Sequence, residues 1–224
     1  DGDNPDLSGG VSLNGVDANA FSGIDNDSTA IGNLTVRNNI LKNLIRGASL
    51  SGLGSGSSGN HVVNNKLDNM PSTSPLSVGI LIMDDFYAEI SGHVLTRVYI
   101  GIQADDFDIP GSPALISGNS IQSYRLGIWL NDFDTDASTF TVQNNQLTTV
   151  PGATGNVGLW VTSFGDAVGA TISHNNVTAA HSGIQGWDLS TSQVIAISGG
   201  TLSGNGYGVW LYNYNRTSEL PNAS

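Results

Sequence analysis

The chain has 224 residues, no cysteine, and a formal net charge of −12 from 19 acidic and 7 basic residues. Without cysteine it can hold neither a disulfide framework nor a thiolate metal site. So few bases cannot neutralise nucleic-acid phosphates, which argues against DNA or RNA as a partner. The chain has 29 glycines and is rich in Asn, Asp and Ser, which favour turns over helix interiors. No apolar run reaches the roughly 18 residues of a membrane span, so we expect an all-β protein without one.

A six-residue unit of the form apolar-x-x-Asn-x-apolar recurs along the chain at intervals of 25 to 30 residues. Asn tolerates the left-handed backbone of a tight bend, and stacked Asn side chains can hydrogen-bond from one copy to the next. His93 and Gly200 replace the Asn in two copies, and we expect local irregularity at both. The copies, in chain order, are Val11–Val16, Val36–Leu41, Val62–Leu67, Ile90–Leu95, Ile116–Ile121, Val142–Leu147, Ile172–Val177 and Ile197–Leu202.

A second unit, of the form Gly-apolar-x-apolar, follows the first. Two of its copies come later than the others, because insertions with proline precede Gly79 and Gly158. A third short segment, in which every second residue is apolar, leads into the six-residue unit, as in Leu34–Val36 and Phe140–Val142. The copies of the second unit are Gly47–Leu50, Gly79–Ile82, Gly101–Ala104, Gly127–Leu130, Gly158–Val161, Gly183–Gly186 and Gly208–Leu211.

Each repeat therefore holds three short segments of period two, separated by turns. Period two is typical of strands, and three strands in roughly 25 residues indicate one turn of a parallel β-helix. The chain resembles the right-handed parallel β-helices of the pectin-lyase-like superfamily. We predict an all-β, right-handed parallel β-helix solenoid over residues 11–215, with about eight rungs of three short strands. Residues 1–10 should form an acidic N-terminal tail or linker, and residues 216–224 a C-terminal tail.

The middle residue of each Gly-opened strand should point outward, because its apolar neighbours point inward. Flat Trp rings beside Gln amides are what a carbohydrate-binding surface needs, and the resemblance implies that this strand faces the substrate cleft. The alternative is that the rings pack under the inserted loops or against another domain. The column reads Ser49, Leu81, Gln103, Trp129, Trp160, Gln185 and Trp210, and we predict ligand binding by its last five members.

An acidic and aromatic turn follows the same strand, as in Asp84-Asp85-Phe86, Asp105-Asp106-Phe107 and Asn131-Asp132-Phe133. Stacked carboxylates repel, so they attract a cation or raise a pKa. We predict the only candidate cofactor, Ca²⁺, at Asp105, Asp106, Asp132 and Asp134. In an enzyme, Asp106 and Asp132 with Arg125 are the catalytic candidates. The alternatives are that each Asp caps its own turn and that Arg97 and Arg125 form surface ion pairs.

Three functional interpretations follow from these patterns. The regular repeats favour a non-catalytic exported module, a rigid scaffold with a carbohydrate-binding outer face. The alternative is a polysaccharide-active enzyme, a glycoside hydrolase or polysaccharide lyase acting on the same face. Against it, the Gly-His-Gly and Arg-Ile-Lys elements of polygalacturonase-like hydrolases are absent. The third is an oligomerising segment, because the open sheet edges of a solenoid can dock end to end.

The composition also bears on partners and location. We expect the partner to be a polysaccharide or neighbouring domains of a longer chain. An acidic, cysteine-free chain rich in Asn and Thr fits an exported bacterial protein. The expected location is therefore extracellular or at the cell surface.

Overall fold

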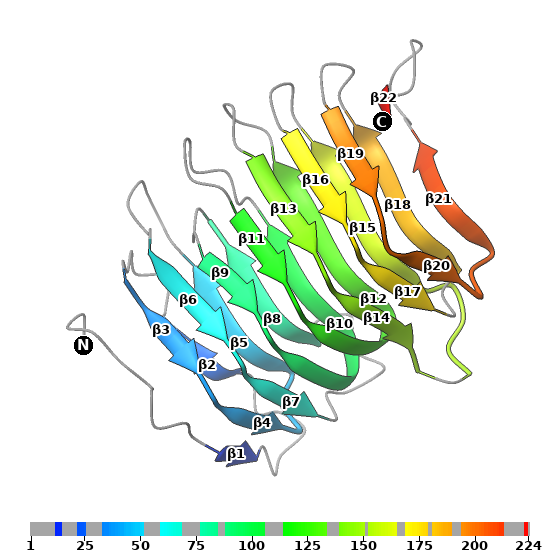
Figure 1. Ribbon diagram of the computed structural model, residues 1–224. Helices are drawn as coiled ribbons and strands as arrows, with labels where there is room; N and C mark the ends of the chain where they lie inside the picture. Colours follow the sequence, from blue (N-terminus) through cyan, green and yellow to red (C-terminus); the bar gives the residue numbers. More distant parts are fainter. Residues whose placement is uncertain are drawn as a thin grey trace.

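The computed structural model is a parallel β-solenoid whose described part contains no helix, which confirms the predicted fold class. Its turns stack from the blue end of the chain to the red end (Figure 1). No helix in the described ranges is long and apolar enough to cross a membrane. The predicted tails lie outside these ranges, apart from residues 222–223. The structure describes residues 12–14, 22–25, 33–51, 59–68, 77–84, 88–105, 114–133, 139–150, 152–164, 169–178, 181–189, 194–212 and 222–223.

One sheet holds the strands of the six-residue unit and those of the Gly-opened unit, 14 strands in all. The first set is β1 (Ser12–Asn14), β4 (Ile40–Lys42), β7 (Lys66–Asp68), β10 (Val94–Asp105), β12 (Ser120–Phe133), β14 (Gln146–Thr149), β17 (Asn176–Thr178) and β20 (Thr201–Ser203). The second set is β2 (Ser22–Asp25), β5 (Arg46–Ser51), β8 (Val78–Met83), the ends of β10 and β12, β15 (Val157–Phe164), β18 (Ser182–Leu189) and β21 (Tyr207–Tyr212).

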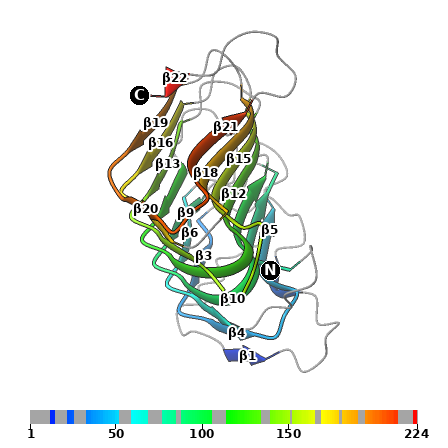
Figure 2. The ribbon, with the colours of Figure 1, turned by 90° about the vertical axis from the view of Figure 1, so that its right-hand side faces the viewer.

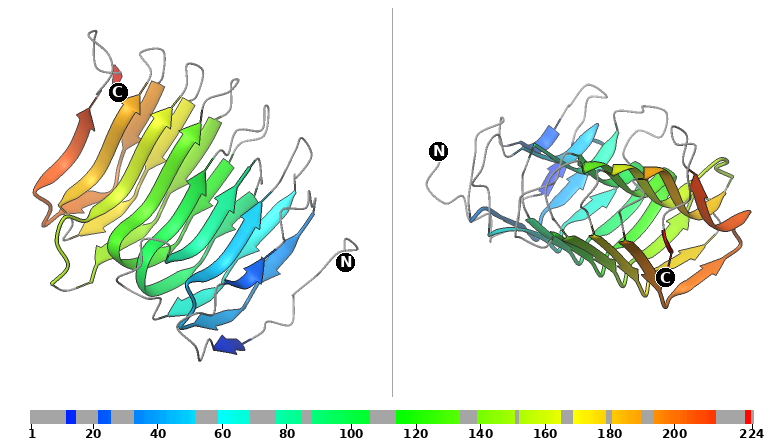
Figure 3. Two further views of the ribbon diagram at one scale, coloured as in Figure 1. Left: turned by 180° about the vertical axis from the view of Figure 1, so that it is seen from behind. Right: turned by 90° about the horizontal axis from the view of Figure 1, so that it is seen from above.

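The second sheet holds the strands that lead into the six-residue unit, and all of its pairs are parallel. Seen along the solenoid, this sheet faces the β12, β15, β18 and β21 layer across the interior (Figure 2), and Figure 3 shows the two layers from above. Its strands are β3 (Thr35–Arg37), β6 (Asn60–Val63), β9 (Ala88–Ser91), β11 (Ala114–Ser117), β13 (Thr139–Gln143), β16 (Gly169–Ser173), β19 (Val194–Ser198) and β22 (Asn222–Ala223).

The solenoid has about five turns, fewer than the eight rungs that the repeats predict. Among the described strands, the five turns from β6 to β18 have a hydrogen-bonded neighbour on both sides of every strand. The outer turns are partial, because β3 is paired on one side only and β20 and β21 end their paths. A sequence repeat therefore forms a full rung only where its strands pair with strands of the repeats before and after it.

The predicted three short strands per rung are also modified in the two central turns. In each of these turns, the strand of the six-residue unit and the Gly-opened strand form one continuous strand. These long strands are β10, with 12 residues, and β12, with 14. Register shifts around Val98 take up the bend, and Arg97 adopts a φ of 55°. The Arg97 guanidinium pairs with Asp68 at 3.0 Å. The surface ion pair expected for Arg97 is confirmed.

The first copy of the six-residue unit is out of the predicted register. Leu13 pairs with Leu41, and Asn14 pairs with Lys42. Had Val11–Val16 aligned as predicted, Asn14 would lie beside Asn39. The prediction was wrong because Leu13, and not Val16, takes the register of Leu41.

Columns of aliphatic side chains, one residue from each rung, fill the interior. Val62 and Ile90, for example, are paired in register and both fully buried. Each fully buried Leu or Ile contributes roughly 1.5–3 kcal/mol to folding, so the stack is held mainly by these columns. The largest fully buried side chains are Leu41, Leu50, Leu67, Ile80, Ile82, Ile90, Leu95, Ile102 and Ile121.

The glycine that opens the second unit is required by the close stacking of rungs. A Cβ at Gly127 would lie 2.4 Å from the carbonyl oxygen of Gly158. The same clash, at 2.4 to 2.7 Å, recurs at each opening glycine from Gly47 to Gly183. Because the atom opposite is backbone, any side chain would push neighbouring rungs apart.

The Asn column forms a buried ladder of hydrogen bonds between rungs. At a typical step, the backbone N–H of Asn119 donates to Asn145 Oδ1 at 3.0 Å, and Asn119 Nδ2 donates to the carbonyl of Ile90 at 3.2 Å. The left-handed backbone that we predicted for this column belongs to the residue before it. Those preceding residues, Asn38, Asn64, Gly92, Gly118, Asn144, His174 and Gly199, have φ between 54° and 68°.

His93 continues the ladder, so the irregularity predicted there was wrong. Its Nδ1 accepts the backbone N–H of Asn65 at 3.0 Å, and its Nε2 donates to the carbonyl of Val62 at 2.7 Å. The imidazole thus supplies the acceptor and the donor that Asn supplies elsewhere, which requires a neutral ring with its proton on Nε2. Burial lowers the pKa of His93 from 6.5 to about 4.

Gly200 does interrupt the ladder, as predicted. Without a side chain it offers no acceptor to the backbone N–H of Asn175, and its own φ is 75°. The side chains of the next turn are also more exposed to solvent. Val209 pairs with the buried Ile184, yet it is 43% exposed. The ladder and the enclosed interior therefore end together.

Candidate ligand-binding site

The structure aligns the predicted outward column in register. Trp129 pairs with Gln103 on one side and with Trp160 on the other. Gln185 lies between Trp160 and Trp210 in the same way. The late copies at Gly79 and Gly158 keep this register, so the proline-containing insertions leave the column intact.

The column is not uniformly open to solvent, which differs from the prediction. Ser49 and Leu81 are buried. Leu81 belongs to a second apolar cluster, separate from the interior core, against which Trp129 and Trp160 pack. Packing against neighbouring strand residues thus accounts for much of the column's apolar character. The remaining buried members of this cluster are Val78, Ile100, Leu126 and Val157.

Trp129 and Trp160 stack on each other, with ring centroids 5.5 Å apart and planes 18° from parallel. Each ring therefore covers one face of the other. A sugar packs on an exposed aromatic face, so this pair cannot act as the continuous flat surface that the sequence suggested.

A chain of hydrogen bonds beside the stack holds Trp129 in place. Trp129 Nε1 donates to Thr162 Oγ1 at 2.9 Å, and that hydroxyl donates to Asn131 Oδ1 at 2.5 Å. Asn131 Nδ2 in turn donates to Asp105 Oδ1 at 2.6 Å. The chain crosses three rungs, and it fixes the indole edge without using the pocket described next.

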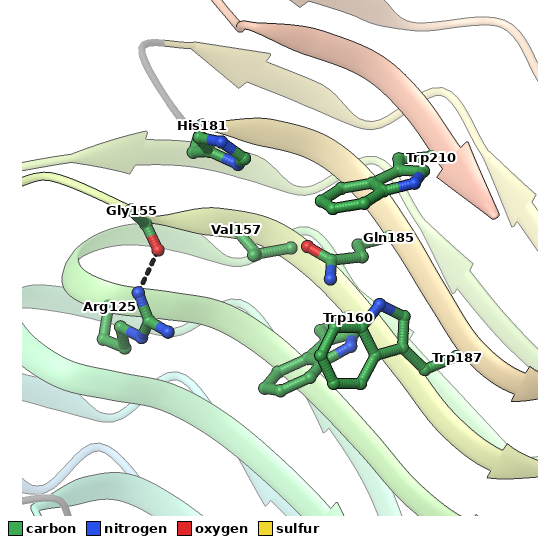
Figure 4. Close-up of a pocket in the computed structure, with 8 residues that line it drawn as sticks. All are labelled: Arg125, Gly155, Val157, Trp160, His181, Gln185, Trp187 and Trp210. Carbon is green, nitrogen blue, oxygen red and sulfur yellow. Dashed lines mark hydrogen bonds between the residues drawn. The ribbon is translucent and has the colours of Figure 1, made fainter. Parts of the chain in front are cut away.

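Gln185 interrupts the Trp column and leaves a gap between Trp160 and Trp210, which are two rungs apart, or roughly 10 Å. A pocket of about 230 Å³ opens there (Figure 4). Its lining comes from β12, β15, β18 and β21 and from the turns before β15 and β18. The residues that line it are Arg125, Gly155, Val157, Trp160, His181, Gln185, Trp187 and Trp210.

Aromatic rings form the walls of this pocket. Trp187 meets Trp160 edge to face, with centroids 5.4 Å apart and planes at 90°. Trp187 is 39% exposed, which makes it the most accessible tryptophan of the described face. The imidazole of His181 lies 6.2 Å from the Trp210 ring on the far side.

Two polar groups of the pocket differ in their access to a ligand. Gln185 is 6% exposed, and its amide lies between Trp160 and Trp210 (Figure 4). The indole N–H of Trp160 is buried and unpartnered among the described residues. A buried polar group without a partner costs about 1–3 kcal/mol, and this cost falls on the Trp160 N–H, which is closed to solvent. The Gln185 amide is not among the buried unpartnered groups, and it is the polar group that a ligand in the pocket can meet.

Arg125 and His181 lie at the edge of the pocket (Figure 4). Arg125 donates from Nη1 to the carbonyl of Gly155 and so holds the turn before β15. His181 Nδ1 lies 3.2 Å from Ser182 Oγ. No carboxylate is among the described lining residues, although the chain as a whole carries a net charge of −12.

The predicted acidic site falls largely outside the described residues. Asp106 and Asp134 lie outside them, and Asp132 is described only in its backbone. The Asp105 carboxylate accepts the hydrogen bond from Asn131. The described residues contain no group of three or more His, Cys, Asp or Glu side chains placed to hold a metal.

The predicted alignment of Asp84 with Asp105 was wrong by one residue. Met83 pairs with Asp105. Asp84 instead has a φ of 52° and accepts a hydrogen bond from Ser51 at 2.7 Å. The Asp84 carboxylate therefore bonds to the neighbouring rung through Ser51.

Sequence reasoning missed Trp187 and His181 as members of the site. Trp187 stands two residues after Gln185 on β18, so period two already placed both on one face. His181 precedes the strand and reaches the pocket across the turn that leads into β18. The pairing of rungs was needed to see that both adjoin Trp210.

Comparison with protein-family models, with curated proteins and with solved structures finds no match for this chain.

Proposed function

We propose that the chain is a non-catalytic, exported β-helix scaffold that binds carbohydrate on its outer face, at the pocket around Gln185. The observation that carries this proposal is a pocket walled by Trp rings with the Gln185 amide placed between two of them. Apolar walls with a few fixed polar groups are the usual composition of small-molecule sites.

The chemistry of a sugar ring fits these residues. Its C–H faces pack on exposed indole rings such as Trp187 and Trp210. Its hydroxyls can both donate and accept, which suits the Gln185 amide. A glycoside hydrolase needs two carboxyl groups at the bond it cleaves, and the described lining contains none.

The wider assignment rests on the chain's repeats and composition. Rungs of 25 to 30 residues with an Asn ladder support placement among the right-handed β-helices of the pectin-lyase-like superfamily. The acidic, cysteine-free composition supports an extracellular or cell-surface location.

Intrinsic fluorescence tests the proposal, because all four tryptophans of the chain lie on this face. The purified chain is titrated with amylose, β-1,4-galactan, β-1,4-mannan, polygalacturonate and alginate, each with Ca²⁺ and with EDTA. We expect a saturable change with at least one polymer, confirmed by calorimetry, and no release of shortened products. Dependence on Ca²⁺ would place the ion in the interaction.

Trp187→Ala serves as the site variant and Tyr212→Ala as its control. Both rings are exposed in the last turns and lie 6.4 Å apart, but only Trp187 lines the pocket. We expect Trp187→Ala to weaken binding at least tenfold and Tyr212→Ala to leave it unchanged. A flat response of the parent chain to all five polymers would refute the proposed function.

A further inference from the structure

The size of the pocket limits what can enter it. Its volume of about 230 Å³ lies below the range of roughly 300–1,000 Å³ usual for drug-sized ligands. It equals the liquid volume of roughly eight waters at about 30 Å³ each, which is about the bulk of one hexose ring. A second sugar residue would have to lie outside.

The rings do not form a continuous flat surface for an extended chain. A polysaccharide that lies along a surface needs successive aromatic faces that are parallel and exposed. Here Trp129 and Trp160 cover each other, and Trp187 stands at 90° to Trp160. Trp187 therefore does not continue the face of Trp160 as a parallel surface.

The polar groups lie in the gap itself. The Gln185 amide is placed between Trp160 and Trp210 (Figure 4), and it is the only pocket amide among the described residues. Arg125 is exposed at the opposite edge and is held to Gly155 through one of its nitrogens. A single ring can thus contact Gln185 and Arg125 at once.

We infer that this pocket binds one terminal sugar ring of a glycan, end-on, with the Gln185 amide as its specificity-determining contact. The inference rests on the proposed function and adds to it the geometry of recognition. The protein would then recognise chain ends, and it would be indifferent to the length of chain behind them.

This geometry is tested by comparing long and short forms of the same glycan at equal mass concentration. Each polymer of the panel is used intact, cut to hexamers, and as the methyl pyranoside of its sugar. If the protein recognises chain ends, the midpoint of the binding titration, expressed as mass of glycan per volume, should fall in proportion to the number of ends created. The methyl pyranoside should also displace the polymer. Binding that weakens more than tenfold on shortening, with no displacement by the methyl pyranoside, would overturn the inference and leave carbohydrate binding intact.

Gln185→Met and Gln103→Met form a matched pair, because both residues occupy the same register column and only Gln185 lines the pocket. Met keeps the length of the side chain and removes its amide. We expect Gln185→Met to weaken the hexamer and the methyl pyranoside by tenfold or more, with an unchanged melting temperature, and Gln103→Met to have no effect. Equal losses in both variants would overturn the end-on site, whereas failure of the parent chain to bind any probe would overturn the proposed function with it.

Discussion

Acidification should destabilise this protein through one buried histidine. His93 takes the place of an Asn in the ladder, and both of its contacts require the neutral ring. Protonation would put a second N–H against the backbone N–H of Asn65, which can only donate. Because burial lowers the pKa of His93 to about 4, the unfolded chain binds this proton more readily than the folded one.

The size of the effect follows from the two pKa values. Stability from this site is complete above the unfolded pKa of 6.5, and it is lost as the pH falls from 6.5 toward about 4. Each unit of difference corresponds to roughly 1.4 kcal/mol. The loss is about 2 kcal/mol between pH 7 and pH 5, and about 3 kcal/mol once both states are protonated.

The variant His93→Asn isolates this contribution. Asn at this position can accept from Asn65 and donate to Val62, as its ladder neighbours do, but it does not titrate. Urea unfolding of both proteins at pH 7 and pH 5 gives the two pH dependences. The parent chain should lose about 2 kcal/mol more than His93→Asn over this interval. Equal losses would refute the assignment of a neutral, hydrogen-bonded His93, whatever the other histidines and the carboxylates contribute to both proteins.

Three further changes test the stack and the pocket. Gly127→Ala places a Cβ 2.4 Å from the Gly158 carbonyl and should cost about 3 kcal/mol or more in urea unfolding. Gly208→Ala, whose Cβ would meet only a side chain at 3.8 Å, should change stability by less than about 0.5 kcal/mol. Asn119→Ala leaves the His93 N–H and a backbone carbonyl without partners and should cost roughly 2–4 kcal/mol, again by urea unfolding. Gln185→Trp fills the gap in the Trp column, and we expect it to abolish glycan binding in the fluorescence assay while the protein stays folded.

The strands and their register could largely be predicted from the sequence, because each repeats a short pattern with a fixed physical cause. The opening glycine recurs since a Cβ would strike the next rung. The exceptions depend on hydrogen bonding and strand pairing, which the residue types alone do not show. Asn and His differ as residue types, yet at position 93 they offer an equivalent donor and acceptor. Leu13 and Val16 are equally apolar, and only the strand pairing shows that Leu13 takes the register of Leu41.

The site was predicted in part for the same reason. Period two placed Trp129, Trp160, Gln185 and Trp210 in one column, and the structure aligns them. What a column cannot reveal is which faces remain open. Trp129 and Trp160 were expected to present their rings to a ligand, but identical neighbours in adjacent rungs stack on each other.

This stacking explains why the pocket lies where the repeat changes. In a solenoid, equal side chains in successive rungs are roughly 5 Å apart, so large flat rings cover one another and contribute to packing. A smaller residue among them opens a space one rung deep, bounded by the exposed faces of the rings on either side. Gln185 is such a residue, and it also carries an amide into the space that it leaves. A pocket can therefore arise on a regular solenoid by one substitution in a column, without an inserted domain or a catalytic cluster.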